Sequence, residues 1–236
     1  MALILNIESS TDICSVSIAR DGKTLVLKES RDKKSHAALI PVFIEELSAI
    51  LRIDLPDLDA VAVSMGPGSY TGLRIGVSTA KGIAYGAGIK LIGIPTLQAM
   101  ALNVTQKSGI DKLKEKILLC PMIDARRMEV FTALYTTSNV LYKEIAAEII
   151  RPGIFSDILE KYEIWFFGNG AEKCKNVIPH SNARFIEAIE PSAAWIAELS
   201  EKAFQEKQFE DIAYFEPFYL KDFIATIPKK NIFPLI

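Results

Sequence analysis

The sequence predicts an α/β protein built from two similar halves, and three observations support that prediction. Hydrophobic residues make up 50% of the 236 positions, as expected of a globular chain with a sizeable core. Three short apolar runs separated by turn residues open the chain, and helical and extended patterns then alternate. Three antiparallel strands followed by helix, strand, helix, strand and helix is the order of an RNase H-like unit, which the second half repeats in weaker form.

The first half contains every element of such a unit. The opening strands are joined by polar turns, and Asp21-Gly22 is a strong hairpin signal. The helix that follows keeps its proline within the first two turns, where proline is tolerated. We expect strands at 2–9, 14–20 and 24–30, a helix at 37–52, a strand at 59–64, a helix at 71–88, a strand at 90–94 and a helix from 95.

The second half begins near Lys112 and reads as a degenerate copy. Strands are expected from Ile117, Glu129 and Glu163, and helices from Pro152 and over 191–205. No segment of disordered composition separates the halves, so we expect them to pack together. The predicted boundaries are 1–108 for the first lobe and 109–236 for the second, with the last residues packing back on the first.

Composition excludes several classes of protein. The chain has 27 basic and 29 acidic residues, whereas a protein that binds nucleic acid by itself carries a basic excess. No apolar run is long enough to span a membrane, and the N-terminal residues read as a first strand and not as a signal peptide, so we expect a cytoplasmic protein. Cys14, Cys120 and Cys174 match no metal or redox spacing, which favours buried free thiols.

The most unusual stretch is SMGPGSYTGLRIG, Ser64 to Gly76, between a predicted strand and helix. Glycines at such a turn let backbone N–H groups approach an anion, so Gly66 and Gly68 are candidate phosphate contacts. The spacing matches neither GxxxxGK[ST] nor GxGxxG, however. The alternative is a tight structural turn in which Ser69 or Thr71 caps the helix. Both interpretations remain open, and the structural one is favoured.

Small residues recur every four positions in the helix after this turn, at Gly72, Gly76, Ala80 and Ala84. This spacing places them on one face, and each helical glycine costs about 1 kcal/mol relative to alanine. Close approach of another element would offset that cost. The approaching element is either the chain's own sheet or a second subunit, and the sequence leaves the two alternatives open.

The helix at 37–52 favours an association surface. Its apolar residues cover more than one face, whereas a surface helix needs only one apolar stripe. A second apolar face often marks a site of association.

Five segments together resemble the TsaB family of glycoprotease-like proteins. They are ILNIESS near the N-terminus, GPGSYTGLRIGVSTAKGIA, IDARRMEVF, FGNGAEK and PFYLK, in that order over nearly the whole chain. The GPGS-aromatic-TGLRIG segment is the most specific of them. One departure is Glu8, where members of this family more often carry aspartate.

The resemblance implies the actin-like ATPase (ASKHA) superfamily fold and a non-catalytic role in bacterial tRNA modification. The catalytic TsaD-type subunit would add threonylcarbamoyl to N6 of adenosine 37 in tRNAs that read codons beginning with A. This chain would dimerise with it, a TsaE-type ATPase would join the complex, tRNA would bind mainly through the complex, and the chain alone would form a homodimer. The implied interface residues are Leu39, Val42, Phe43, Glu46, Gly72, Leu73, Ile75, Gly76, Thr79, Ala80 and Ile83.

The sequence offers no catalytic centre of its own. Where the catalytic relatives hold a metal with an HxxxH pair, this chain has Thr96 and Met100, which do not replace two imidazoles. The two histidines, His36 and His180, lie far apart in sequence. We therefore expect no metal, no cofactor and no catalytic residue.

Two alternatives from other classes stay open. An ATPase of this superfamily needs glycine in its first hairpin, but Glu8 to Asp12 has none and Asp12 would repel phosphate. A stand-alone homodimeric binding module would use the same helices. Asp124, Arg126 and Arg127 form either a local turn, which is favoured, or a contact to a partner or nucleotide. The residues proposed for weak anion or nucleotide contact are Glu8, Ser9, Gly66, Gly68 and Arg126.

Overall fold

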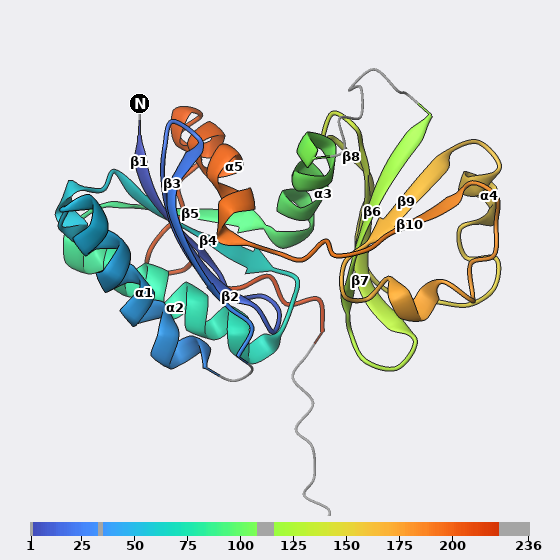
Figure 1. Ribbon diagram of the computed structural model, residues 1–236, viewed down its shortest axis with the longest axis horizontal. Coiled ribbons are helices and arrows are strands. Elements are labelled where there is room, and N and C mark those ends of the chain that lie inside the picture. Colours follow the sequence, from blue (N-terminus) through green and yellow to red (C-terminus); the bar gives the residue numbers. More distant parts are fainter. Residues whose placement is uncertain (1, 33–34, 108–115, 222–236) are drawn as a thin grey trace, which may run out of the picture.

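The computed structural model describes residues 2–32, 35–107 and 116–221, which form two lobes side by side (Figure 1). Each lobe is built on one five-stranded sheet. The first sheet has the order β3-β2-β1-β4-β5, with β1, β2 and β3 antiparallel and β1, β4 and β5 parallel. Its strands are β1 (Leu3–Glu8), β2 (Cys14–Arg20), β3 (Lys23–Ser30), β4 (Ala60–Gly66) and β5 (Lys90–Pro95).

Three helices cover the two faces of the first sheet (Figure 1). Helices α1 (His36–Leu51) and α2 (Tyr70–Ala87) lie on one face, where Ile40, Leu47 and Val77 join the buried residues of β1, β2 and β4. Helix α5 (Ala193–Gln205) lies on the other face. A short 3-10 turn, Leu55–Asp57, connects α1 to β4. The helices predicted at 37–52 and 71–88 are thus present, each displaced by one residue.

The second sheet repeats the topology of the first, with the order β10-β9-β6-β7-β8. β6, β7 and β8 are antiparallel, and β6, β9 and β10 are parallel. Its strands are β6 (Ile117–Asp124), β7 (Glu129–Thr136), β8 (Leu141–Ile149), β9 (Glu163–Phe167) and β10 (Ala183–Ile186). This identity of strand order confirms the predicted α/β class and the weaker second copy.

The second lobe departs from the prediction in its helices. The helix expected from Pro152 is only the single turn α4 (Ser156–Leu159), because a turn precedes it in which Gly153 has φ +84°. A 3-10 turn, Glu172–Cys174, follows β9. Strand β10 was not predicted, since four residues are too few for a period to be recognised.

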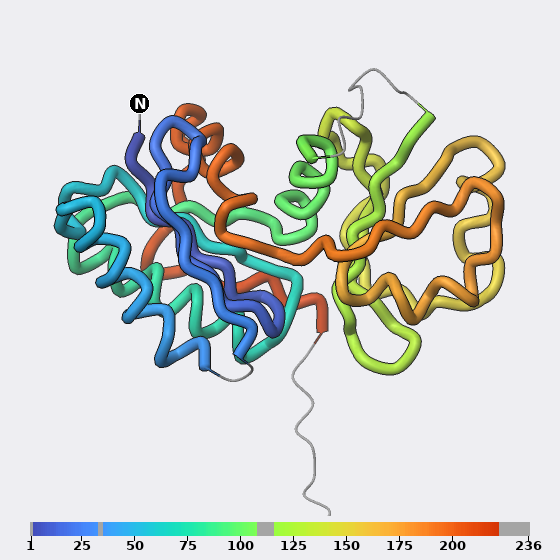
Figure 2. Tube along the Cα trace, in the orientation of Figure 1, coloured from blue at the N-terminus to red at the C-terminus, as the bar shows by residue number. Residues whose placement is uncertain are grey.

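Two helices cross between the lobes on either side of the predicted boundary near residue 108. Helix α3 (Thr96–Lys107), assigned to the first lobe, packs Leu97, Met100 and Val104 on the second sheet. Helix α5 does the reverse, and the chain returns from β10 to the first sheet to form it (Figure 2). Its Ser200 hydroxyl donates to Asn6 Oδ1 of β1 at 2.7 Å, in the buried layer between helix and sheet.

Residues 209–221 form a C-terminal strap across the first lobe. The Glu210 N–H donates to the carbonyl oxygen of Leu91, and the Phe215 ring is buried against Gly93. Further along, the Phe218 N–H donates to the carbonyl oxygen of Met65. The strap therefore packs back on the first lobe, while the last residues for which this was predicted, 222–236, lie outside the described part of the chain. Within the described residues, no helix has the length and apolar character needed to cross a membrane.

Candidate functional site

The glycine-rich turn is built onto the neighbouring turn between β1 and β2. The Ser69 N–H donates to the carbonyl oxygen of Ser10 at 2.6 Å, and Ser69 caps α2 by accepting from the Gly72 N–H. A Cβ at Gly68 would lie closer to the Ser10 carbonyl oxygen than real Cβ atoms come to any atom. The turn is thus a structural cap, as favoured above, and Gly68 permits close approach of two backbone segments and not only of a ligand.

The small-residue stripe of α2 faces the chain's own sheet. Cβ atoms at Gly72 and Gly76 would collide with the Ser9 carbonyl oxygen and the Ser9 hydroxyl respectively. Ala80 and Ala84 are fully buried over the sheet. Gly72, Leu73, Gly76 and Ala80, four of the predicted interface residues, are therefore buried within the lobe, and the predicted interface as a whole stays a prediction.

Glu8 ends β1 beneath this turn and is sealed from solvent, with an exposed fraction of 1%. Its Oε1 accepts from the Ser10 N–H at 2.6 Å and from the Ser64 hydroxyl at 3.0 Å. Burial raises the pKa of this carboxyl, while these hydrogen bonds lower it by a smaller amount. A carboxylate whose oxygen is engaged by its own backbone has no open side for a phosphate or a metal ion.

The predicted anion residues are not gathered into one open site. Ser9 is fully buried, and Gly66 lies against the strap, where a Cβ would be 2.8 Å from the Phe218 carbonyl oxygen. Arg126 is exposed and belongs to the second lobe, across a cleft from Gly68.

Helices α1 and α2 flank an apolar groove of about 650 Å³ on the outer face of the first lobe. Its walls include Ile44, Ile53 and Leu55 from α1 and the residues after it, and Thr79 and Ile83 from α2. Among the residues of α1 that do not line the groove, two large apolar side chains are open to solvent, Val42 and Ile50, with exposed fractions of 44% and 58%.

Of the remaining predicted interface residues, Thr79 and Ile83 line this groove, while Leu39, Val42, Phe43, Glu46 and Ile75 do not. Leu39, Ile75, Thr79 and Ile83 are half-buried, and Glu46 is exposed and forms an ion pair with Lys28 at 2.9 Å. Phe43 is buried against the sheet. The prediction missed the end of the groove, formed by Arg52, Ile53, Asp54 and Leu55, although apolar residues at 50, 53 and 55 were a signal for it.

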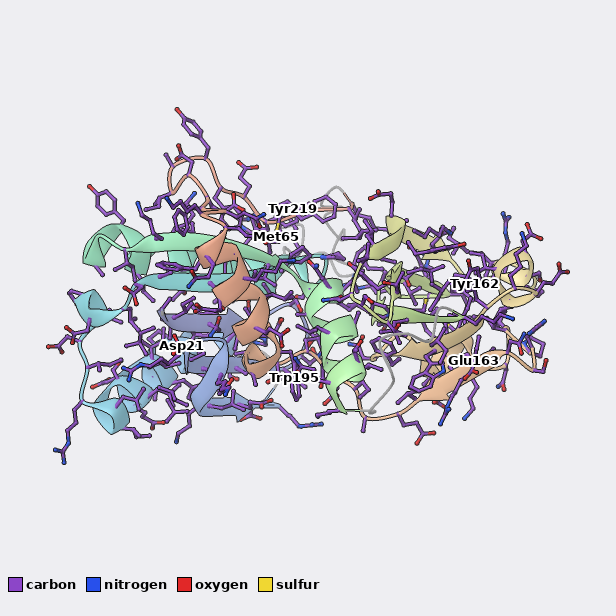
Figure 3. The ribbon with its side chains drawn as sticks, turned by 90° about the horizontal axis from the view of Figure 1, so that it is seen from above. Asp21, Met65, Tyr162, Glu163, Trp195 and Tyr219 are labelled. Carbon is purple, nitrogen blue, oxygen red and sulfur yellow. The ribbon has the colours of Figure 1, made fainter. Side chains whose placement is uncertain are left out.

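A second cavity, the inter-lobe cleft, has a volume of about 520 Å³. The turn after β1 and the start of α2 form one wall, and the Asp124–Arg126 turn forms the other. The strap closes one end, where the rings of Tyr70 and Tyr219 lie 4.8 Å apart and the Arg74 guanidinium lies 5.5 Å from the centre of the Tyr70 ring. Tyr219 thus sits at the junction of the lobes, beside Met65 (Figure 3).

The turn between β6 and β7 is held in place by Lys173, whose side chain is partly buried. Lys173 Nζ contacts the Asp124 carboxylate and donates to the carbonyl oxygens of Arg127 and Glu129, both at 2.7 Å. Asp124 also accepts from the Arg126 N–H at 2.9 Å, as expected of a local turn. Arg126 and Arg127 both have positive φ, +70° and +46°, and both side chains are exposed.

Thr96 and Met100 were predicted to stand in place of a metal-binding pair. Thr96 and Met100 are both buried, with Met100 in the layer between α3 and the second sheet. Among the described residues, no cluster of histidine, cysteine, aspartate or glutamate side chains could hold a metal ion. His36 is buried at the start of α1, with Nε2 at 2.9 Å from the Thr11 carbonyl oxygen.

Comparison with known proteins shows the family to which the chain belongs. The family model TsaD, tRNA N6-adenosine threonylcarbamoyltransferase, matches residues 30–229. The TsaB protein of Escherichia coli is 28% identical over 94% of this chain and 96% of its own length. The TsaB protein of Buchnera aphidicola subsp. Schizaphis graminum is 31% identical over 73% of this chain and 81% of its own length. The chain belongs to the TsaB branch of the TsaD family.

Solved structures agree on the fold. A Pseudomonas aeruginosa protein described as similar to peptidase YeaZ superposes with a TM-score of 0.81 at 20% identity, covering 94% of this chain and 100% of its own. The polyphosphate/ATP-glucomannokinase of Arthrobacter sp. strain KM gives a TM-score of 0.51 at 13% identity, covering 87% of this chain and 100% of its own. The chain therefore shares the two-lobed α/β fold of these proteins, as its sequence predicts.

Proposed function

We propose that this chain is the non-catalytic partner subunit in synthesis of threonylcarbamoyladenosine in tRNA. The reaction it supports adds threonylcarbamoyl to N6 of adenosine 37 in tRNAs that read codons beginning with A. The TsaB relatives are biosynthesis proteins of this modification by name, and the family model is named after the transferase. One structural observation supports the subunit role above the others: the apolar groove between α1 and α2.

The groove favours binding of a folded partner. Val42 and Ile50 expose apolar surface on a helix whose other apolar face, Ile40 and Leu47, is already buried in the core. Covering such side chains stabilises an association by roughly 25 cal/mol for each Å² removed from water. An exposed apolar patch beside a groove fits the helices of a TsaD-type subunit.

The proposed role is to bind and hold the catalytic subunit. The TsaD-type partner would supply the metal and the transfer chemistry, since Thr96 and Met100 stand at the ligand positions here. A TsaE-type ATPase would join the pair, tRNA would be bound mainly by the complex, and the same groove would pair two copies when the chain is alone. No ATPase role is assigned, because the Glu8 carboxylate is committed to Ser10 and Ser64.

The test is association in solution. Light scattering after size-exclusion chromatography would be applied to this chain alone, and mixed with the TsaD-type protein of the same cell. Val42→Glu places a charge on the exposed face of α1, and Ile149→Glu is the matched control on an exposed position of β8. We expect a mixed species whose Kd rises at least tenfold with Val42→Glu and is unchanged by the control.

Thermal unfolding of each variant separates loss of binding from loss of folding. Absence of a mixed species with the wild-type chain at micromolar concentration would refute the partnership. If the mixed species forms equally well with Val42→Glu and with Ile83→Glu in the groove wall, the partnership would stand. The surface assigned to it would then be refuted.

A further inference from the structure

The inter-lobe cleft presents aromatic rings and arginines together. Tyr70 and Tyr219 pair at one end of it, and Tyr219 keeps an exposed fraction of 37%. Arg74 lies over the Tyr70 ring, and Arg126 stands on the opposite wall. Tyrosine faces and arginine planes are the groups on which unpaired bases stack, and arginine also binds phosphate.

The acidic groups of the second-lobe wall are already paired. Asp124 contacts Lys173, and Glu129 contacts Lys221 of the strap. Among the described residues, no ion pair is formed by Arg126, which lines the cleft, or by its neighbour Arg127, so both positive charges are available beside the cleft. Asp12, on the first-lobe wall, has interactions of its own and opposes them, as does the exposed Glu216 of the strap, which lies near Tyr219.

The backbone holds these arginines outward. Two consecutive non-glycine residues with positive φ are uncommon, and such a conformation persists only where neighbouring groups fix it. Lys173 fixes it from below by bonding the Arg127 carbonyl oxygen, and Asp124 bonds the Arg126 N–H. The result is a fixed turn with two exposed arginines, of which Arg126 lines the same cleft as Tyr70 and Tyr219.

We propose that this cleft mouth, where Tyr70, Tyr219 and Arg126 line the cleft and Arg74 lies over the Tyr70 ring, binds a single-stranded segment of RNA. The tyrosine pair would stack an unpaired base, and the arginines would bind the flanking phosphates. The choice of RNA over other anions rests on the proposed function, whose substrate is a tRNA with an unpaired anticodon loop.

The proposed RNA contact adds to the RNA binding of the whole complex and does not replace it. Two neutralised phosphates on a single strand give a salt slope of about −1.4, far below that of a dedicated nucleic-acid-binding protein. This agrees with the excess of acidic over basic residues in the whole chain. The cleft would position the loop, and the partner would supply most of the affinity.

The experiment measures binding of a fluorescent anticodon stem–loop RNA to the full chain by anisotropy, alone and in the mixed complex, between about 50 and 200 mM salt. Arg126→Gln is the test variant, and Arg20→Gln is its control. Arg20 is exposed and pairs with Leu3 at the opposite end of the first sheet, so the control removes the same charge far from the cleft. Tyr219→Ala and Tyr219→Phe test stacking.

We expect Arg126→Gln to weaken binding about fivefold and to reduce the salt slope by about 0.7, the contribution of one phosphate on a single strand. Tyr219→Ala weakens binding at least fivefold with an unchanged slope, while Tyr219→Phe, which keeps the ring, binds as the wild type does. A fully base-paired RNA of the same length binds more weakly and equally to all variants.

Two results would overturn the proposal. One is equal RNA binding by Arg126→Gln and Arg20→Gln, alone and in the complex, including the case in which no RNA binding is measurable. The other is a cleft variant, Arg126→Gln or Tyr219→Ala, that no longer binds the TsaD-type partner but binds RNA as the wild type does. That result would make the cleft mouth a protein contact. The proposed role of the groove between α1 and α2 is tested by its own experiment, since the partnership is measured separately and without RNA.

Discussion

Gly72 of α2 lies directly on the carbonyl oxygen of Ser9, so close that no side chain fits between them. The same approach brings the start of α2 onto the turn between β1 and β2, where Ser69 bonds Ser10. The glycines of this helix therefore serve the interior of the lobe. Their sequence signature would look the same if they served an interface, because the cost of a helical glycine is offset by any close neighbour.

The first prediction compares two glycines of α2. Gly72→Ala forces the helix away from Ser9 and should lower the free energy of unfolding by more than 2 kcal/mol, as other severe steric changes do. Gly82→Ala, by contrast, adds a Cβ with nothing within 4 Å and should raise it by about 0.5 to 1 kcal/mol. Urea unfolding of both variants provides the measurement.

The comparison is informative because both changes add one methyl group to the same helix. If Gly72→Ala were as stable as Gly82→Ala, the close packing of α2 on the β1–β2 turn would be incorrect. Binding of the TsaD-type partner by Gly82→Ala should be unchanged, since stability and association are separate properties here.

Local sequence patterns predicted most of the first lobe. Apolar periodicity and turn chemistry sufficed for β1 to β5, α1 and α2, because each of these elements buries one face locally. They failed where the chain crosses between lobes. Helix α5 has a good amphipathic pattern, but the pattern does not say which sheet it covers, and the bond from Ser200 to Asn6 spans nearly the whole chain.

The candidate site was predicted in part, for the same reason. The two apolar faces of α1 indicated a surface, and Val42 lies on it. The pairing of Tyr70 with Tyr219 joins residues far apart in sequence, so no local spacing could reveal it. The stripe of α2 was ambiguous because spacing identifies a face but not its neighbour.

The second prediction concerns the pH dependence of stability through Glu8. Burial raises its pKa above 4.5 in the folded chain, so the folded state keeps this proton to higher pH than the unfolded state does. The free energy of unfolding therefore falls as pH rises from about 4.5 through the folded-state pKa, and the contribution is constant above it. Glu8→Gln keeps the acceptor oxygen but cannot ionise, so its stability relative to wild type should increase with pH.

Chemical denaturation between about pH 4.5 and 8 measures this difference, with Glu160→Gln, an exposed position, as the control. Glu8→Ala should be less stable than Glu8→Gln by about 1 to 3 kcal/mol, because it leaves the Ser10 N–H buried without an acceptor. A Glu8→Gln variant that loses stability relative to wild type as pH rises would contradict the assigned shift.

The third prediction concerns the cysteines. All three are free and buried, and burial raises the pKa of Cys14 to about 11 and that of Cys120 to about 12. Burial also raises the pKa of Cys174. Because the thiolate is the reactive form, the native chain should not react with a thiol reagent at pH 8 within minutes, while the chain in guanidinium should react at all three. Rapid labelling of one native thiol, located by mass spectrometry, would show that its segment is open.

The last prediction concerns the strap. Lys81 of α2 donates to the carbonyl oxygens of Ala213 and Phe215, at 3.2 and 2.9 Å, and these bonds fix the strap beside the helix. Lys81→Met keeps the aliphatic stem but removes both bonds, so it should lower the free energy of unfolding by about 1 to 3 kcal/mol.

Loosening of the strap should be local. Cleavage by chymotrypsin after Tyr214, which directly precedes Phe215 and has an exposed fraction of 84%, should become several-fold faster in Lys81→Met than in wild type. Lys161→Met, an exposed lysine of the second lobe, provides the control for loss of charge alone. Because Phe215 remains buried against Gly93 in the variant, the rest of the lobe should keep its protection from cleavage. Equal cleavage rates in the three proteins would mean that the buried Phe215 ring, and not Lys81, holds the strap in place.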